Sequence, residues 1–96
     1  MIQSFDLDGG CKLLVDTTAA ADVAAVGVWY GIGSRDESTE LRGATHVVEH
    51  MLFKGTGKHS ASRIAGIIDK TGGTINAFTE RECMALYSVV PSDAFE

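Results

Sequence analysis

Short apolar runs, separated by glycines and charged residues, divide this chain into strand-like and helix-like segments. Two extended stretches flank Asp8-Gly9-Gly10, a combination typical of a β-hairpin turn. The next stretch, 22–30, carries Val, Ala and Trp on both alternating faces, so we expect it to be a central strand covered on both sides. The predicted strands are residues 2–7, 11–16, 22–30, 74–79 and 82–90.

Two helices are predicted between the third and fourth of these strands. The first covers about 39–54, and Gly55 is placed to cap its C-terminus. The second begins after Ser60, a favourable N-cap, and continues to about Lys70 with its isoleucines on one face. Together the segments predict an α+β fold in which a mixed or antiparallel sheet is backed by helices.

The last residues have the pattern of a further helix that is just beginning. Pro91 opens this stretch, and Asp93 and Glu96 have the spacing of an N-cap and the third helical position. We therefore expect residues 1–96 to be the N-terminal portion of a single longer domain, truncated at the start of a helix near Pro91.

Composition and charge exclude several classes of protein. The chain has 96 residues, of which 45% are hydrophobic and 22% charged, a balance typical of a globular domain. Its net charge of −5 argues against a nucleic-acid or anionic-membrane partner. The longest apolar run, 23–32, is shorter than the roughly 20 residues of a membrane helix. The absence of a visible signal peptide predicts a cytoplasmic protein, in which Cys11 and Cys83 are expected to be reduced thiols.

The sequence HVVEH, residues 46–50, places three polar side chains inside an apolar run. At about 100° per residue, His46, Glu49 and His50 fall within an arc of roughly 100° on one face of a helix. Two neutral imidazoles suit Zn²⁺, and a neighbouring carboxylate can take the proton of a water that the metal activates. The alternative is a helix with two hydrogen-bonded core histidines and an incidental glutamate. We favour the metal site, because burying three unpaired polar groups in a cleft is costly.

A catalytic zinc normally has three protein ligands and a water molecule, and this helix supplies two of them. His59 lies in a loop that contains glycines, and we expect it to be exposed to solvent. Glu82 is predicted to open the last strand, and its role stays open. It can be a third ligand, a group that supports the ligands from behind, or a solvated carboxylate.

Several stretches resemble the insulinase-type zinc metallopeptidases, the family of pitrilysin, insulin-degrading enzyme and mitochondrial processing peptidase. The matching segments, in the order and spacing of the family, are GSRDE at 33–37, HVVEHMLFKGT at 46–56, GGTINAFTERE at 72–82 and LYSVV at 86–90. The likeness covers nearly the whole chain and is strongest for the processing-peptidase branch. It departs at Met84 and Leu86, where that branch often has a threonine and a tyrosine.

The resemblance implies the fold of the processing peptidases and a zinc-dependent endopeptidase that cleaves peptides or unfolded segments. His46 and His50 would be zinc ligands and Glu49 the general base. The third ligand in the family is a glutamate, which would lie beyond Glu96. The resemblance also places substrate binding on an edge strand, where an extended peptide adds to the sheet. The residues expected there are Asn76, Ala77 and Phe78.

The same resemblance implies that the enzyme needs more than this chain. Family members draw groups for catalysis from a second, similar half-domain or subunit, so the chain alone is expected to be inactive. One alternative is an inactive structural or partner subunit on the same fold. Another is a bare metal-binding module, in which the two histidines hold zinc weakly.

Overall fold

The computed structural model describes residues 1–95 and begins with a β-hairpin. Strands β1 (Ile2–Asp6) and β2 (Lys12–Asp16) pair antiparallel, from Ile2 opposite Asp16 to Asp6 opposite Lys12. A short 3₁₀ turn connects them, and Gly9 and Gly10 both have positive φ, at 79° and 77°. Only glycine adopts that conformation without strain, so the predicted hairpin and its turn are confirmed.

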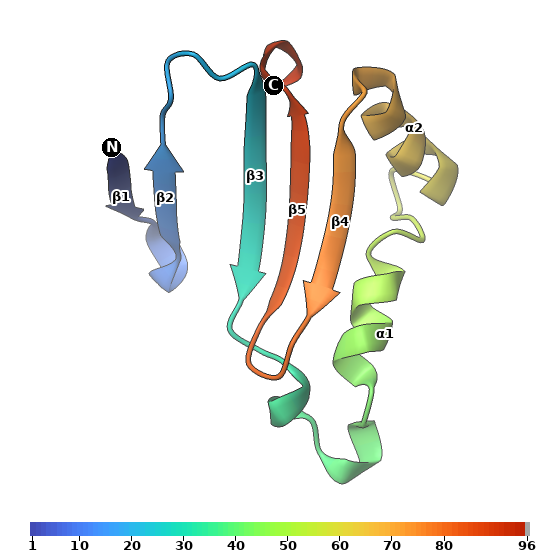
Figure 1. Ribbon diagram of the computed structural model, residues 1–96. Helices are drawn as coiled ribbons and strands as arrows, with labels where there is room; N and C mark the ends of the chain where they lie inside the picture. Colours follow the sequence, from blue (N-terminus) through green and yellow to red (C-terminus); the bar gives the residue numbers. More distant parts are fainter. Residues whose placement is uncertain (96) are drawn as a thin grey trace.

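The other three strands form a separate antiparallel sheet (Figure 1). It consists of β3 (Val23–Tyr30), β4 (Thr74–Thr79) and β5 (Met84–Pro91), in the order β3-β5-β4, and both pairings are antiparallel. Within residues 1–95 the predicted central position of the third strand is therefore wrong, since β5 is the central strand and β3 lies at one edge. Apolar residues on both faces of β3 indicate what its faces can pack against, but they do not identify its neighbours in the sheet.

The buried side chains confirm that β5 is the centre of the sheet. Met84, Ala85 and Val90, all on β5, are 6%, 0% and 8% exposed. By contrast, Val28 and Trp29, which lie on opposite faces of β3, are 48% and 62% exposed, so neither face of β3 is fully covered within residues 1–95. The radius of gyration is 15.6 Å, whereas a closed domain of this length has about 12.5 Å. The described residues are therefore more extended than a closed domain, and they leave much of their apolar surface uncovered.

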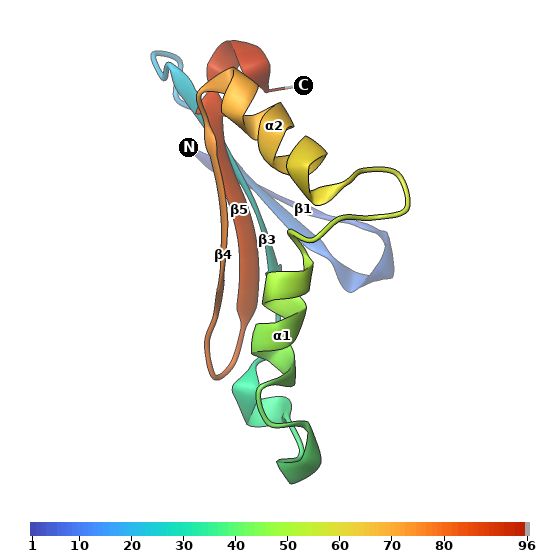
Figure 2. The same ribbon diagram turned by 90° about the vertical axis from the view of Figure 1, so that its right-hand side faces the viewer.

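Helices α1 (Ala44–Met51) and α2 (Ala61–Thr71) lie on the same side of this sheet (Figure 2). The first is shorter than the predicted 39–54. Gly43 has a φ of 85°, which is not helical, so α1 begins only after it. The segment Thr39–Leu41 before Gly43 forms a separate 3₁₀ turn. After Met51 the chain continues in tighter turns with i→i−3 bonds, so Gly55 does not cap α1 directly.

The second helix agrees well with its prediction. The hydroxyl of Ser60 accepts a hydrogen bond from the backbone N–H of Arg63 at 3.2 Å, which confirms Ser60 as the N-cap. Gly72 ends the helix with a φ of 76°. The expectation that His59 is exposed is wrong, because the residue is half-buried. Its backbone N–H donates to the Thr56 hydroxyl at 3.1 Å and its C=O accepts from the Thr56 N–H at 2.7 Å, so the loop turns back on itself at this residue.

The chain leaves β5 in a 3₁₀ turn, Ser92–Ala94. Glu96, which the predicted helix start requires at its third position, lies outside the described residues. Strand β5 also begins two residues later than predicted, so Glu82 lies in the β4–β5 turn. None of the helices within residues 1–95 has the length and apolar character needed to cross a membrane. Two antiparallel sheets with helices against one of them confirm the predicted α+β class.

Candidate metal centre

One face of α1 brings the three polar side chains of HVVEH together. His46, Glu49 and His50 each offer a ligand atom, and these atoms lie within 4.8 Å of one another. The Nε2 atoms of the two histidines are 3.0 Å apart, and the rings meet edge to face with centroids 4.6 Å apart. Spacing of three and four residues on a helix therefore produces the predicted cluster.

The burial that was expected around this cluster is not present within residues 1–95. Both imidazoles are exposed and only Glu49 is half-buried. The neighbouring apolar residues Val47 and Met51 are 61% and 59% exposed. Because these side chains are not fully buried, the cost of burying unpaired polar groups does not favour a metal here. The support for a metal site comes from the positions of the donor atoms.

That geometry fits a zinc ion. Two nitrogens bound to one tetrahedral zinc at about 2.0–2.1 Å lie about 3.3–3.4 Å apart, close to the observed 3.0 Å. A small rotation of either ring makes up the difference. Because both rings are exposed, space remains for a further protein ligand and for water. His46 and His50 can hold the ion through Nε2, provided that both nitrogens are deprotonated.

A carboxylate from the preceding loop fixes the start of α1. Glu37 accepts hydrogen bonds from the backbone N–H groups of Gly43, at 2.9 Å, and Thr45, at 2.7 Å. These bonds, led by the one from the Thr45 backbone, hold the pKa of Glu37 below its ordinary value of 4.5. The bonds satisfy N–H groups that a helix N-terminus otherwise leaves unpaired. Sequence reasoning missed this role, because Glu37 lies well before the helix and outside the usual N-cap position.

Glu49, the candidate general base, is hydrogen-bonded to the three-stranded sheet. The hydroxyl of Thr79, the last residue of β4, donates to Oε2 of Glu49 at 2.6 Å. This contact between α1 and β4 joins residues 30 positions apart in the sequence. No sequence pattern indicates this contact, apart from the presence of Thr79 in a segment that matches the family.

The turn after β4 is fastened to the loop that precedes α1. The backbone N–H groups of Ser34 and Arg35 donate to the carbonyls of Glu80, at 3.1 Å, and Arg81, at 2.9 Å. The two backbones approach so closely at Gly33 that a Cβ there would lie 2.4 Å from the Glu80 carbonyl oxygen. One short loop, 33–37, therefore holds both the start of α1 and the end of β4.

Glu82 belongs to this loop contact and not to the metal cluster. It is exposed and pairs with the guanidinium of Arg35 at 2.6 Å. Its carboxylate is not one of the atoms that converge with His46 and His50. Of the roles left open for Glu82, the structure therefore supports neither a zinc ligand nor a group behind the ligands.

The three predicted substrate-binding residues lie consecutively on β4, which forms an edge of the three-stranded sheet within residues 1–95. Their side chains alternate between its faces. Ala77 shares the helix-covered face with Thr79, whereas Asn76 and Phe78 lie on the opposite face. The Ala77 N–H donates to Oδ1 of Asn76 at 2.8 Å, and since an N–H carries one hydrogen, it does not enter the ladder with β5.

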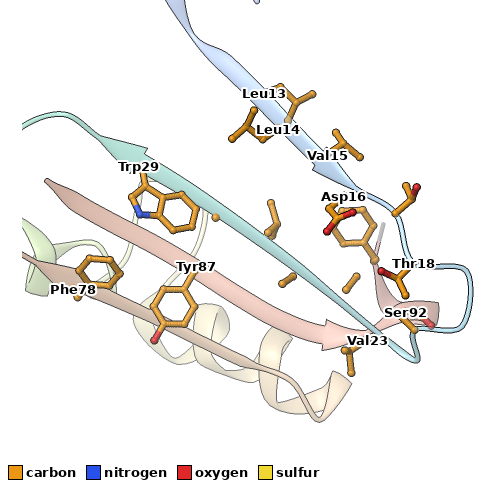
Figure 3. A pocket seen from close by; sticks show the side chains of 17 residues that line it. Leu13, Leu14, Val15, Asp16, Thr18, Val23, Trp29, Phe78, Tyr87 and Ser92 are labelled. Atoms are coloured by element: carbon orange, nitrogen blue, oxygen red, sulfur yellow. The ribbon is translucent and has the colours of Figure 1, made fainter. Parts of the chain in front are cut away.

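A groove of about 990 Å³ lies between the hairpin and the three-stranded sheet (Figure 3). The rings of Trp29, Phe78 and Tyr87 line one side and β2 lines another, and Phe78 and Tyr87 pack with their centroids 6.2 Å apart. By register these rings lie on the sheet face opposite Thr79. The groove is therefore separate from the cluster on α1.

The chain belongs to the insulinase family (peptidase family M16), whose sequence profile matches residues 12–96. This confirms the resemblance found from the sequence motifs.

Similar proteins carry the names of zinc proteases and processing peptidases. An uncharacterized zinc protease of Streptomyces coelicolor is 46% identical over 84 residues, which are 88% of this chain and 18% of that protein. An uncharacterized zinc protease of Bacillus subtilis is 40% identical over 90 residues, 94% of this chain and 22% of that protein. The probable mitochondrial-processing peptidase subunit beta of Arabidopsis thaliana is 39% identical over 84 residues, 88% and 16% of the two chains.

The fold has a close counterpart among solved structures. The crystal structure of a protease from Helicobacter pylori superimposes with a TM-score of 0.87 and 28% sequence identity. The match covers 97% of this chain and 23% of the other. The chain therefore spans between 16% and 23% of the length of these proteins.

Proposed function

We propose that this chain is part of a zinc-dependent endopeptidase that uses water to cleave peptides or unfolded protein segments. The observation that carries the proposal is the convergence of His46, Glu49 and His50 on α1, in contact with the edge strand β4. The zinc-protease names of relatives in the same family support it.

Each group of the cluster has a role in this proposal. His46 and His50 hold zinc through Nε2, and the third protein ligand is a glutamate that follows residue 96 in the longer polypeptide. Zinc supplies Lewis acidity for the attacking water and the scissile carbonyl. Glu49 takes the proton of that water and later delivers a proton to the leaving amine.

Strand β4 is the proposed binding site for the peptide. An extended substrate would pair with its free edge at Asn76, Ala77 and Phe78, and backbone hydrogen bonds would hold many different sequences. Pairing requires that the Ala77 N–H exchange its bond to Asn76 for a bond to the substrate. Because β4 contacts α1, a peptide at this edge lies beside the metal cluster.

A second, similar half-domain or subunit is proposed to complete the site. The support is the uncovered apolar surface of the described residues, which includes Val47 and Met51 beside the metal cluster. One relative is named as the beta subunit of a processing peptidase, which is in line with a partner chain. The chain alone is accordingly proposed to be inactive.

Substitution Glu49→Gln in the full-length protein tests the proposal. Hydrolysis of an unfolded peptide should fall by at least about 100-fold, since general-base catalysis contributes about 10²–10⁴. Zinc should stay bound, because both histidines are intact. The matched control is Glu40→Gln, an exposed glutamate in the loop before α1, which should keep wild-type turnover.

The same pair of variants separates an enzyme from an inactive partner subunit. A wild-type protein that binds zinc in its native assembly without hydrolysing peptides, or a Glu49→Gln variant with undiminished turnover, would contradict the proposed activity.

A further inference from the structure

The hydrogen bond between Thr79 and Glu49 is the contact on which this inference rests. At 2.6 Å from hydroxyl oxygen to carboxylate oxygen, it falls in the short range of charge-assisted bonds. Both residues are half-buried. A threonine hydroxyl can donate one hydrogen bond, and the Thr79 hydroxyl donates it to Oε2 of Glu49.

We propose that Thr79 is a positioning residue for the general base, an inference that rests on the proposed function. By holding Oε2, the hydroxyl restricts rotation of the Glu49 carboxylate and leaves Oε1 as the oxygen that accepts the proton of the attacking water. A free glutamate side chain samples several rotamers, and fixing it in advance removes that entropy cost from the reaction.

Backbone hydrogen bonds on the C-terminal side of Thr79 hold this residue in place. Thr79 ends β4, and the turn that follows is closed by the bond from the Glu80 N–H to the Cys83 carbonyl at 2.8 Å. The loop 33–37 fastens this turn through Ser34 and Arg35. Rigid support of this kind is what a group needs if it is to orient another side chain.

The same loop also holds the helix that carries Glu49. Glu37 binds the N-terminus of α1 through Gly43 and Thr45. Donor and acceptor are thus both anchored to residues 33–37, which fixes the distance between them. This gives a physical role to the GSRDE segment, which the chemistry of the metal site alone does not explain.

The test compares Thr79→Val with Thr79→Ser in the full-length protein. Valine keeps the shape and the strand preference but removes the hydroxyl, whereas serine keeps the hydroxyl. We expect Thr79→Val to lower kcat about 10- to 100-fold, the usual effect of removing a partner that orients a catalytic group. KM and zinc content should stay near wild-type values, because neither zinc ligand nor peptide contact is altered. Thr79→Ser should restore most of kcat.

Two controls exclude a general structural effect. Thr17→Val makes the same chemical change at an exposed threonine between β2 and β3 and should leave kcat unchanged. Adding Thr79→Val to Glu49→Gln should cause no further loss of rate, because the hydroxyl acts through the carboxylate that is already absent. A further loss would overturn the proposal, since Thr79 would then act independently of Glu49.

The remaining outcomes are also decisive. If Thr79→Val keeps full kcat while Glu49→Gln abolishes turnover, the positioning role is wrong and the proposed function stands. If Glu49→Gln has no effect, the proposed function fails first. Should the valine variant not fold, Thr79→Ala and Thr79→Ser give the same comparison. Equal kcat in those two variants would overturn the proposal, and a lower kcat for alanine would support it.

Discussion

The carboxylate of Glu37 accepts a hydrogen bond from the backbone N–H of Thr45 at 2.7 Å. This bond fixes the first turn of α1, the helix that contains the candidate metal site. A second bond from Gly43 joins it. Negative charge at a helix N-terminus interacts favourably with the helix dipole. Loss of this carboxylate should therefore loosen α1 itself.

Glu37→Gln should lower the free energy of unfolding of the full-length protein at neutral pH, and the difference from wild type should depend on pH. The hydrogen bonds hold the pKa of folded Glu37 below 4.5. Its contribution is therefore present above the unfolded value and is lost as the pH falls through the folded value. Denaturant unfolding of both proteins between neutral pH and pH 3 measures this. A difference that grows toward acid pH would contradict the assignment.

Gly33→Ala should destabilise the fold by about 1–3 kcal/mol, the cost of forcing atoms into a packed contact. The added Cβ would meet backbone atoms of Glu80 and Arg81 at 2.4–2.5 Å, and backbone cannot rotate away. The φ of Gly33 is −153°, so the effect is steric and not conformational. Gly31→Ala, where nothing lies within 4 Å of the added atom, is the control and should unfold like wild type. Equal stability of both variants would refute the close approach.

Ala77→Pro should raise KM about two- to tenfold, the value of one lost hydrogen bond. Proline removes the N–H that the substrate is proposed to use, and an edge strand tolerates it where the N–H points outward. Ala77→Ser keeps the N–H and should keep KM near the wild-type value. Steady-state kinetics on an unfolded peptide gives both values. An unchanged KM for the proline variant would argue against peptide addition to β4.

Glu82→Gln should leave zinc content unchanged and should alter the free energy of unfolding by no more than about 1 kcal/mol, the usual range for exposed ion pairs. Glu82 pairs with Arg35 on the surface, outside the metal cluster. Elemental analysis of the purified full-length protein checks the zinc content. Loss of zinc would restore Glu82 as a candidate third ligand.

Local signals in the sequence predicted the features that depend on neighbouring residues. The cluster of His46, Glu49 and His50 follows from helical spacing, and Ser60 was recognised as an N-cap because it precedes an amphipathic run. Strand β4 has the predicted bounds, 74–79, since glycines set its start.

Features that depend on tertiary structure could not be predicted in this way. The order β3-β5-β4 is a choice among neighbours that periodicity does not encode. Glu37 and Thr79 act on residues 8 and 30 positions away, through bonds that exist only once the loop and the sheet are assembled. Gly33 has an ordinary extended φ, so only the approach of another backbone reveals why a side chain is excluded.

A crystal structure of the full-length protein, with anomalous diffraction data recorded at the zinc absorption edge, tests whether His46 and His50 bind zinc. We predict a zinc peak at about 2.0–2.1 Å from the Nε2 atoms of His46 and His50, with a glutamate that follows residue 96 as the third protein ligand. A zinc-loaded protein with no peak at these two histidines would contradict the proposed metal site.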